Sequence, residues 1–435
     1  MDAERAAVRA NGQRPKVFGL HPVRYLRHIP APIRVLSTGV LINRLGGFVT
    51  VFLALILAVR NVPTVRIGIA LVLSAAFAIA GSWLGGALVT RWGSRPAIFL
   101  SMAGSALFTV ALIPVSPYLV TVAILCLISL CNRVFVPAAS TMVGRLSPPG
   151  ERLQMFAFFQ LCFNIGAAAG PAIAGFLLTR SLTALLSIDA GTSACFALAA
   201  LRLPGAKPLP PAPAKPLRTG LVGQSGKIRH DRGYLAFCVG VALVALVYCQ
   251  SSGPLPLVFR AHHYNLELLG YLFSANAIAV ILCQLPLSFF TRRLPVWLPL
   301  AAGALLIGGA YTVLLAGVSL PLLILNVTLW SAGEIVYYPV TPAVATMMSG
   351  PRTHGTYQGA LEVARTTGQA IGPSLGVFAY SVRPWLPWWG CGVLGPAAAG
   401  LFLVLLADSR ARQAGPGRAH RTARVAEAQQ RTATS

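Results

Sequence analysis

Residues 154–179 read QMFAFFQLCFNIGAAAGPAIAGFLLT, an uncharged and almost wholly apolar stretch. A bilayer core of about 30 Å requires roughly 20 such residues in one helix, so this stretch is long enough to cross a membrane. The rest of the chain has the same character, because 56% of its 435 residues are hydrophobic and only 10% are charged. Soluble domains carry about 25% charged residues, so the composition excludes an ordinary soluble protein and favours a helical membrane protein.

Eleven further stretches meet the same criterion, which predicts an all-α integral membrane protein with twelve transmembrane helices in two bundles of six. The predicted helices are 35–58, 67–90, 97–115, 119–144, 154–179, 182–201, 234–258, 267–290, 296–316, 320–347, 355–381 and 386–407. The predicted organisation is an N-tail 1–34, a first bundle 35–201, a linker 202–233, a second bundle 234–407 and a C-tail 408–435. The linker is basic and rich in proline, which is typical of a semi-rigid spacer.

Basic residues are distributed unevenly between the two sides of these helices. Of the 35 Lys and Arg residues, 27 fall in the tails, the linker and the loops of one side, five in loops of the other side and three inside helices. Because cytoplasmic loops are enriched in Lys and Arg, both termini are predicted to be cytoplasmic, in the cell (inner) membrane. The same rule explains the net charge of +25 without a nucleic-acid partner. The Arg-over-Lys bias is typical of a GC-rich bacterial genome.

The two halves align without a gap at a constant offset of 202 residues across their middle. The matched pairs are Arg91 and Arg293, Pro137 and Pro339, Ser147 and Ser349, Gly166 and Gly368, and Gly170-Pro171 and Gly372-Pro373. Six plus six helices in the same orientation form a parallel repeat, related by an axis along the membrane normal. Such a repeat predicts a substrate site near the middle of the bilayer, between two bundles that rock against each other.

Three motifs resemble those of the major facilitator superfamily, and the resemblance covers residues 34–407. Residues 86–95, GALVTRWGSR, are similar to its loop motif G-x-x-x-D-R-x-G-R-R. Arg133 resembles its membrane-embedded basic residue, and Gly166-x-x-x-Gly170-Pro171-x-x-x-Gly175 resembles the antiporter motif of its drug:proton antiporter branches. The resemblance implies the major facilitator fold and a conformational switch. The switch residues that it implies are Gly86, Arg91, Gly93, Arg95, Gly166, Gly170, Pro171, Gly372 and Pro373.

Two departures from the loop motif concern its charge. Thr90 stands where the family has an acidic residue, and Gly144-Arg145 replaces the acid often found near the end of the fourth helix. The resemblance implies that such acids pair with loop arginines and steady one conformation. We therefore expect the outward-facing state to be less firmly latched than is usual in the family.

Six ionisable residues lie inside the predicted helices, away from the helix ends: Arg44, Arg133, Asp189, Glu334, Glu362 and Arg365. Each costs roughly 2.5–3.5 kcal/mol at a helix centre, so each needs a partner, water or a proton. We interpret Glu334, Asp189 and Glu362 as candidate proton-coupling residues, with Glu334 foremost because it stands in an otherwise uncharged run. Each of these acids has a purely structural alternative, and Glu362 can pair with Arg365 three residues later.

Candidate substrate-binding residues are polar or aromatic residues inside the predicted helices, and the resemblance implies that the fourth and tenth of these helices line the central cavity. They are Arg133, Asn132, Arg44, Tyr248, Gln250, Tyr337 and Tyr338. Arginines can hold a carboxylate, and aromatic rings can stack on flat or cationic ligands. Tyr248-x-Gln250 and Gly333-Glu334 with Tyr337-Tyr338-Pro339 are similar to segments of bacterial multidrug exporters. For each aromatic residue, packing or lipid contact is the alternative.

The favoured hypothesis is a secondary exporter that expels an amphipathic small molecule in exchange for protons. An importer or symporter of a nutrient, and a non-transporting membrane receptor, are the alternatives. An enzyme has no support, because the sequence carries no nucleophile elbow, metal cluster or phosphate loop. No cofactor and no metal are implied. The expected partners are a small-molecule substrate, protons and the lipid bilayer, and a monomer is expected.

Overall fold

The computed structural model describes residues 29–205, 231–350 and 353–414, apart from residues 50–52, 54–55, 58–59, 61, 149, 179–180 and 265. Most of the predicted tails and linker (residues 1–28, 206–230 and 415–435) lie outside the described residues. Within the described ranges the chain is helical, with turns and short loops between the helices.

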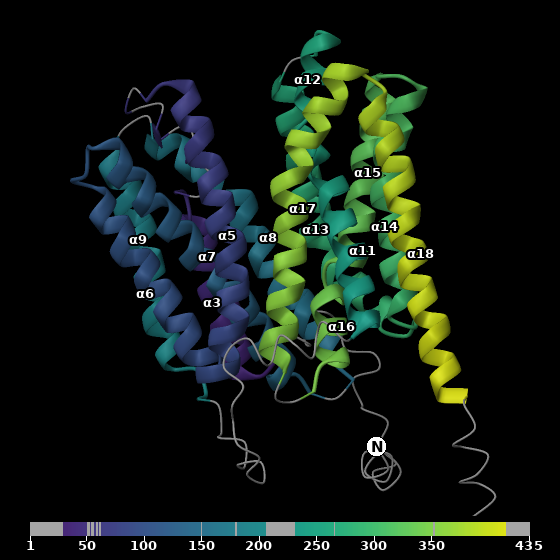
Figure 1. The fold of residues 1–435 in the computed structure, drawn as a ribbon, viewed down its shortest axis with the longest axis horizontal. Helices are drawn as coiled ribbons and strands as arrows, with labels where there is room; N and C mark the ends of the chain where they lie inside the picture. The colour runs from purple at the N-terminus through teal and green to yellow at the C-terminus, as the bar shows by residue number, and fades with distance from the viewer. Residues whose placement is uncertain are drawn as a thin grey trace, which may run out of the picture.

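Twelve helical segments or pairs of segments form two bundles, which lie side by side in Figure 1. The first bundle contains α3 (Ala31–Gly46), α5 (Thr64–Trp92), α6 (Ser94–Leu112), α7 (Tyr118–Leu146), α8 (Arg152–Leu178) and α9 (Leu182–Leu201). The second contains α11 (Arg232–Tyr248) with α12 (Leu255–Ala261), α13 (Leu266–Thr291), α14 (Trp297–Thr312), α15 (Leu320–Tyr337) with α16 (Val340–Met348), α17 (His354–Val382) and α18 (Leu386–Ala414). Ten described spans are long and apolar enough to cross a membrane. The predicted architecture of two six-helix bundles is confirmed.

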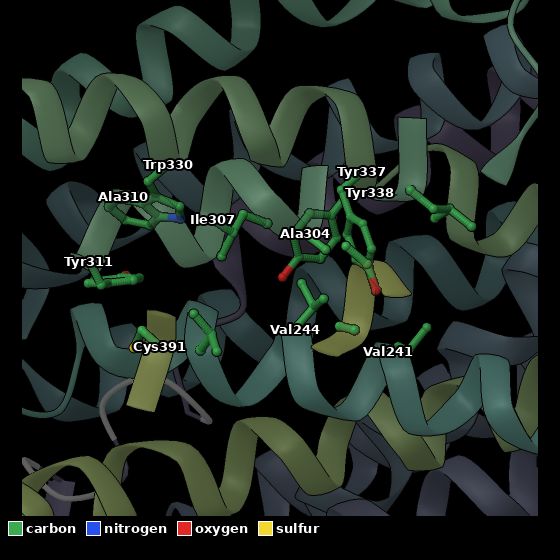
Figure 2. Close-up of a cluster of buried hydrophobic side chains, with 14 of the residues drawn as sticks. Val241, Val244, Ala304, Ile307, Ala310, Tyr311, Trp330, Tyr337, Tyr338 and Cys391 are labelled. Carbon is green, nitrogen blue, oxygen red and sulfur yellow. The ribbon is translucent and has the colours of Figure 1, made fainter. Parts of the chain in front are cut away.

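Small residues allow the helices of the second bundle to pack closely. A Cβ added to Gly308 of α14 would lie 2.8 Å from the Cα of Gly395 in α18, and one on Gly303 would lie 2.7 Å from the Cβ of Tyr337. Since lipid tails are as apolar as the side chains, such close van der Waals packing is a main source of helix association in a bilayer. Figure 2 shows the resulting core, where side chains of α11, α14, α15 and α18 meet.

Asp189 of α9 determines where the first helix ends. Its Oδ2 atom accepts hydrogen bonds from the backbone N–H groups of Phe48 (2.8 Å) and Val49 (2.9 Å), immediately after α3 ends at Gly46. Backbone N–H groups that bond to a side chain are unavailable for continuing the helix. The structure therefore differs from the predicted continuous helix 35–58, because a buried carboxylate interrupts it.

Two predicted helices of the second bundle are also interrupted. In the segment 234–258, α11 gives way to the single turn Cys249–Ser251 before α12 begins at Leu255. In the segment 320–347, α15 and α16 are separated at Tyr338-Pro339, since proline has no N–H and cannot continue the helical hydrogen bonding. The matching Pro137 in α7 is accommodated without a break.

The bundles contact each other mainly through α5 against α17 and α8 against α13. We call the end of the molecule where α5 ends and α17 begins the basic end, because it carries Arg91, Arg145 and Arg293. There a Cβ on Gly86 would lie 2.8 Å from the Cα of Gly359, so the two backbones touch. In Figure 1, α5 and α17 converge at the basic end and diverge toward the other end.

Hydroxyl groups extend this contact between α5 and α17. The Oγ1 atoms of Thr90 and Thr356 are 2.9 Å apart, and the hydroxyls of Ser82 and Thr366 are 3.2 Å apart. At the basic end, α5 and α17 are thus joined by glycine contacts and by hydrogen bonds between hydroxyl groups.

Removing the Asp189 carboxylate is expected to destabilise the fold. In Asp189→Ala the two buried N–H groups lose their acceptor, and the free energy of unfolding should fall by about 2–3 kcal/mol. Asp189→Asn keeps an acceptor oxygen and should lose less. Thermal unfolding of the purified variants measures the difference, and an unchanged melting temperature for Asp189→Ala would contradict this role.

Cysteine pairs between α5 and α17 test the conformation. In a variant without the native cysteines, Thr90→Cys with Thr356→Cys should cross-link readily under mild oxidation. The matched control is Val72→Cys with Ser374→Cys, which lie about five helical turns further along the same faces, where both side chains are exposed.

A protease site is placed in the linker, so that cleavage separates the two halves of the chain on a denaturing gel. Halves that are joined by the disulfide stay together after cleavage. The control pair should react more slowly. Faster reaction of the control pair would show that the basic end is the open one.

Candidate functional site

Charged side chains from α3, α7 and α17 gather where the two bundles meet. Arg133 of α7 donates a hydrogen bond across the interface from Nη2 to Oε1 of Gln369 in α17, at 3.3 Å. The charged groups near Arg133 include Glu362 and Arg365, and those near Arg44 include Arg133, Asp189 and Glu362. The structure thus brings five of the six predicted intramembrane charges into one electrostatic group.

Glu362 and Arg365 pair with each other, as their spacing predicts. Arg365 Nη1 lies 3.0 Å from Glu362 Oε1, and Arg365 Nη2 donates to Thr341 Oγ1 at 2.9 Å. Only 2% of the Glu362 side chain is exposed, so the pair is buried. Removing one partner of a buried ion pair leaves the other charge uncompensated, so each residue has a structural reason to be there, which favours the structural alternative for Glu362.

Asp189 also has a structural setting. Both described bonds to its Oδ2 atom come from backbone N–H groups, and Arg44 lies nearby as a charged neighbour. This geometry favours its structural alternative over proton coupling.

Glu334 has a different environment, inside the second bundle. Its Oε2 atom accepts hydrogen bonds from the hydroxyl of Tyr248 (3.2 Å) and from Nδ2 of Asn276 (3.3 Å). The side-chain amide of Asn276 is itself oriented by Ser331, at 2.9 Å. Within the described chain no Lys or Arg forms an ion pair with Glu334, although the residue is only 6% exposed. Neutral donors alone hold this acid.

Aromatic rings surround the Glu334 carboxylate. Tyr248 makes edge contacts with Trp330 (5.4 Å between centroids) and with Tyr338 (5.3 Å), and Phe273 adds an edge contact to Trp330 (5.7 Å). The Arg365 guanidinium lies 5.4 Å from the centroid of Tyr338. Tyr338 therefore connects the aromatic cluster to the ion pair at the bundle interface.

Three of the predicted substrate-binding residues have contacts within their own bundle. Tyr337 is buried in the second core against Phe402, with ring centroids 6.2 Å apart. Gln250 donates from Nε2 to the carbonyl of Gly372 at 3.1 Å, and Asn132 accepts from Ser105 at 3.3 Å. These contacts favour roles in packing and helix positioning for Tyr337, Gln250 and Asn132. The other predicted substrate-binding residues lie at or beside the interface cluster: Arg44, Arg133, Tyr248 and Tyr338.

The glycine motif of α8 fits it against α3 at the level of Arg44. A Cβ on Gly166 would lie 2.5 Å from the Cβ of Arg44, and one on Gly170 would lie 2.7 Å from its carbonyl oxygen. In the second bundle, a Cβ on Gly372 of α17 would lie 2.7 Å from the carbonyl of Leu246 in α11. Each glycine-rich helix thus packs closely on the first helix of its own bundle.

The remaining switch candidates lie on the basic end or in the glycine-rich helices. Gly93 has φ +91°, a conformation that residues with a Cβ rarely adopt, so glycine is required at this turn. Arg91 is exposed and Arg95 is half-buried. Pro373 lies against Gly253, where an added Cβ would be 2.8 Å from the Cα of Pro373. Pro171 lies within α8, but its side-chain surroundings are outside the described residues.

Sequence reasoning missed Gln369 and Phe163. Gln369 follows Arg365 by four residues, so both lie on the same face of α17, and this spacing could have identified it. Phe163 lies 4.2 Å from the Arg44 guanidinium in a cation–π contact, a pairing between separate helices that no local pattern indicates.

Comparison with known proteins assigns this architecture. The family model of the Major Facilitator Superfamily matches residues 36–251 and 241–431. An uncharacterized MFS-type transporter of Bacillus subtilis, YqjV, is 22% identical over 343 residues, covering 78% of this chain and 83% of the relative. The multidrug resistance protein MdtH of Cronobacter sakazakii is 24% identical over 344 residues, covering 77% and 82%.

Among solved structures, the human organic anion transporter MFSD10 (TETRAN) superposes with a TM-score of 0.67 at 18% identity, covering 86% of this chain and 99% of that one. This likeness establishes the fold alone. The family model, by contrast, matches both halves of the chain, and the relative YqjV is named a transporter. The chain therefore belongs to the major facilitator superfamily of membrane transporters.

Proposed function

We propose that this transporter exports an amphipathic small molecule in exchange for protons, by alternating access between its two bundles. The observation that carries the proposal is Glu334, a buried acid whose described partners are the neutral donors Tyr248 and Asn276. A carboxyl group in the bilayer without a counter-ion is stabilised by binding a proton, so it can load and release one as the surroundings change. Glu362 and Asp189 already have charged or backbone partners.

The direction of transport is proposed from orientation and conformation. With both termini in the cytoplasm, the basic end faces inward, and the closed contact of α5 with α17 corresponds to an outward-facing state. The antiporter motif and the name of the MdtH relatives, multidrug resistance protein, support export. An importer of the same fold would move protons and substrate in the same direction, and a receptor would move neither.

Switching is proposed to depend on the neutral contact between Thr90 and Thr356. Breaking hydroxyl bonds and glycine contacts costs less than separating a charged pair in the same place. The contact between Thr90 and Thr356 should therefore separate more readily than an acid and an arginine in the same place would.

Restoring an acid at position 90 tests this latch. Thr90→Asp is expected to slow opening of the basic end several-fold. A carboxylate forms stronger, charge-assisted hydrogen bonds with the arginines of that end than a hydroxyl does. Thr90→Asn, similar in shape and uncharged, is the matched control. Single-molecule fluorescence between labels on the two bundles measures the rate, and equal rates for Thr90→Asp and wild type would contradict the proposed latch.

Glu334→Gln tests proton coupling. The assay uses everted membrane vesicles with a dye that reports the proton gradient, and a panel of lipophilic cations, carboxylates and neutral antibiotics is added. At least one compound of the panel should cause the wild-type protein to release protons from the vesicles. Glu334→Gln should lose this response by about tenfold or more, because the amide cannot bind and release a proton.

Glu362→Gln and Asp189→Asn are the matched controls, each exchanging an acid for its amide. Proton release that persists in Glu334→Gln and disappears in a control would move the proton site to that acid. Substrate and proton moving in the same direction would favour the importer.

A further inference from the structure

We propose that Arg44 and Arg133, with Gln369, form an anion-binding site, and that the substrate carries a carboxylate or a similar oxyanion on an apolar body. This substrate class rests on the transport function proposed above, because it describes the same interface between the bundles.

The interface cluster has more positive than negative charge. Three arginines, Arg44, Arg133 and Arg365, lie near two acids, Asp189 and Glu362. Glu362 pairs with Arg365 at 3.0 Å, and Asp189 accepts two backbone N–H groups. Among the described residues, Arg44 and Arg133 are therefore left without a carboxylate of their own inside the bilayer.

Arg44 has hydrogen-bonding capacity that the protein does not use. Its Nε atom is buried without a partner, and its guanidinium donates no hydrogen bond to any residue that the structure describes. The group instead lies over the ring of Phe163, at 4.2 Å. A guanidinium offers five N–H donors, and leaving a buried one such as Nε unpaired is costly. A ligand that accepts these donors would remove that cost.

Arg133 supplies the second half of the site. Its one described hydrogen bond, to Gln369, is long at 3.3 Å and joins the two bundles. A carboxylate suits arginine because it accepts two parallel N–H bonds in the plane of the guanidinium. An anion bound here would contact α3, α7 and α17 together, so its arrival and departure would act directly on the contact between the bundles.

The same charges disfavour a cationic substrate at this position. A lipophilic cation would meet Arg44 and Arg133 in a low-dielectric setting, where like charges repel strongly. The Glu334 carboxylate does not offset them, because it lies in the second bundle with Tyr248 and Asn276.

Binding of three matched naphthalenes tests the charge selectivity. The full chain is reconstituted in nanodiscs of phosphatidylcholine, so that no anionic lipid supplies the anion, and is titrated with 2-naphthoate, 2-naphthamide and (2-naphthyl)trimethylammonium. We expect 2-naphthoate to bind about tenfold or more tightly than the other two. Tighter binding of the cation, or no binding of 2-naphthoate at millimolar concentration by the folded protein, would overturn the proposal.

Four variants locate the site. Arg44→Gln and Arg133→Gln should each weaken 2-naphthoate binding by about tenfold or more, while Arg44→Lys, which keeps the charge without the bidentate geometry, should fall between them and wild type. Arg260→Gln makes the same exchange at an exposed residue of α12 and should bind like wild type. Wild-type affinity in both interface variants would overturn the assignment.

Melting without ligand shows whether each variant is folded, and Arg44→Lys keeps the test valid if Arg44→Gln is not. Binding needs no proton gradient, so the two proposals fail separately. Arginine-dependent carboxylate binding without proton release would leave the anion site in place and refute proton-coupled export. Proton-coupled export of cations, without any binding of carboxylates, would support proton-coupled export and refute the anion site.

Discussion

The cost of placing charge inside a bilayer governs this molecule, and the six charged residues that lie well inside its helices meet that cost in four ways. The Asp189 carboxylate accepts hydrogen bonds from two backbone N–H groups, and these bonds interrupt the first helix. Glu362 and Arg365 pair within one helix. Among the described residues, Glu334 is held by the neutral donors Tyr248 and Asn276, and Arg44 and Arg133 share the interface between the bundles. The groups with incomplete partners are those to which we assign transport.

Close contact between small residues complements this distribution of charge. Gly86 and Gly359 bring α5 and α17 together at the basic end, and Gly166 and Gly170 hold α8 against the Arg44 segment of α3. The contact between Gly86 and Gly359 is the one of these that joins the two bundles, and it is tight but short-ranged, so a rigid-body movement of one bundle breaks it within a small displacement. The closed end is thus well packed and still separable, which is what alternating access requires.

The sequence predicts the helices and their division into two bundles well, because a run of apolar residues must span the bilayer whatever its neighbours are. It also predicts the Glu362–Arg365 pair, since both residues lie on one helix. The break after Gly46 is not predictable, because its cause, Asp189, lies more than 140 residues away. Nor does the sequence distinguish Tyr337 in the core from Tyr338 beside Arg365. An apolar helix gives little sign of which side faces its bundle, and packing decides it.

The most direct test of coupled export is transport by the purified chain in proteoliposomes under an imposed pH gradient and no other energy source. With the protein in a single known orientation, the account predicts that substrate accumulates, against its own gradient, on the side with the higher proton concentration. This accumulation should stop when an ionophore collapses the pH gradient. Accumulation on the opposite side, or a substrate flux that ignores the pH gradient, would contradict proton-coupled export.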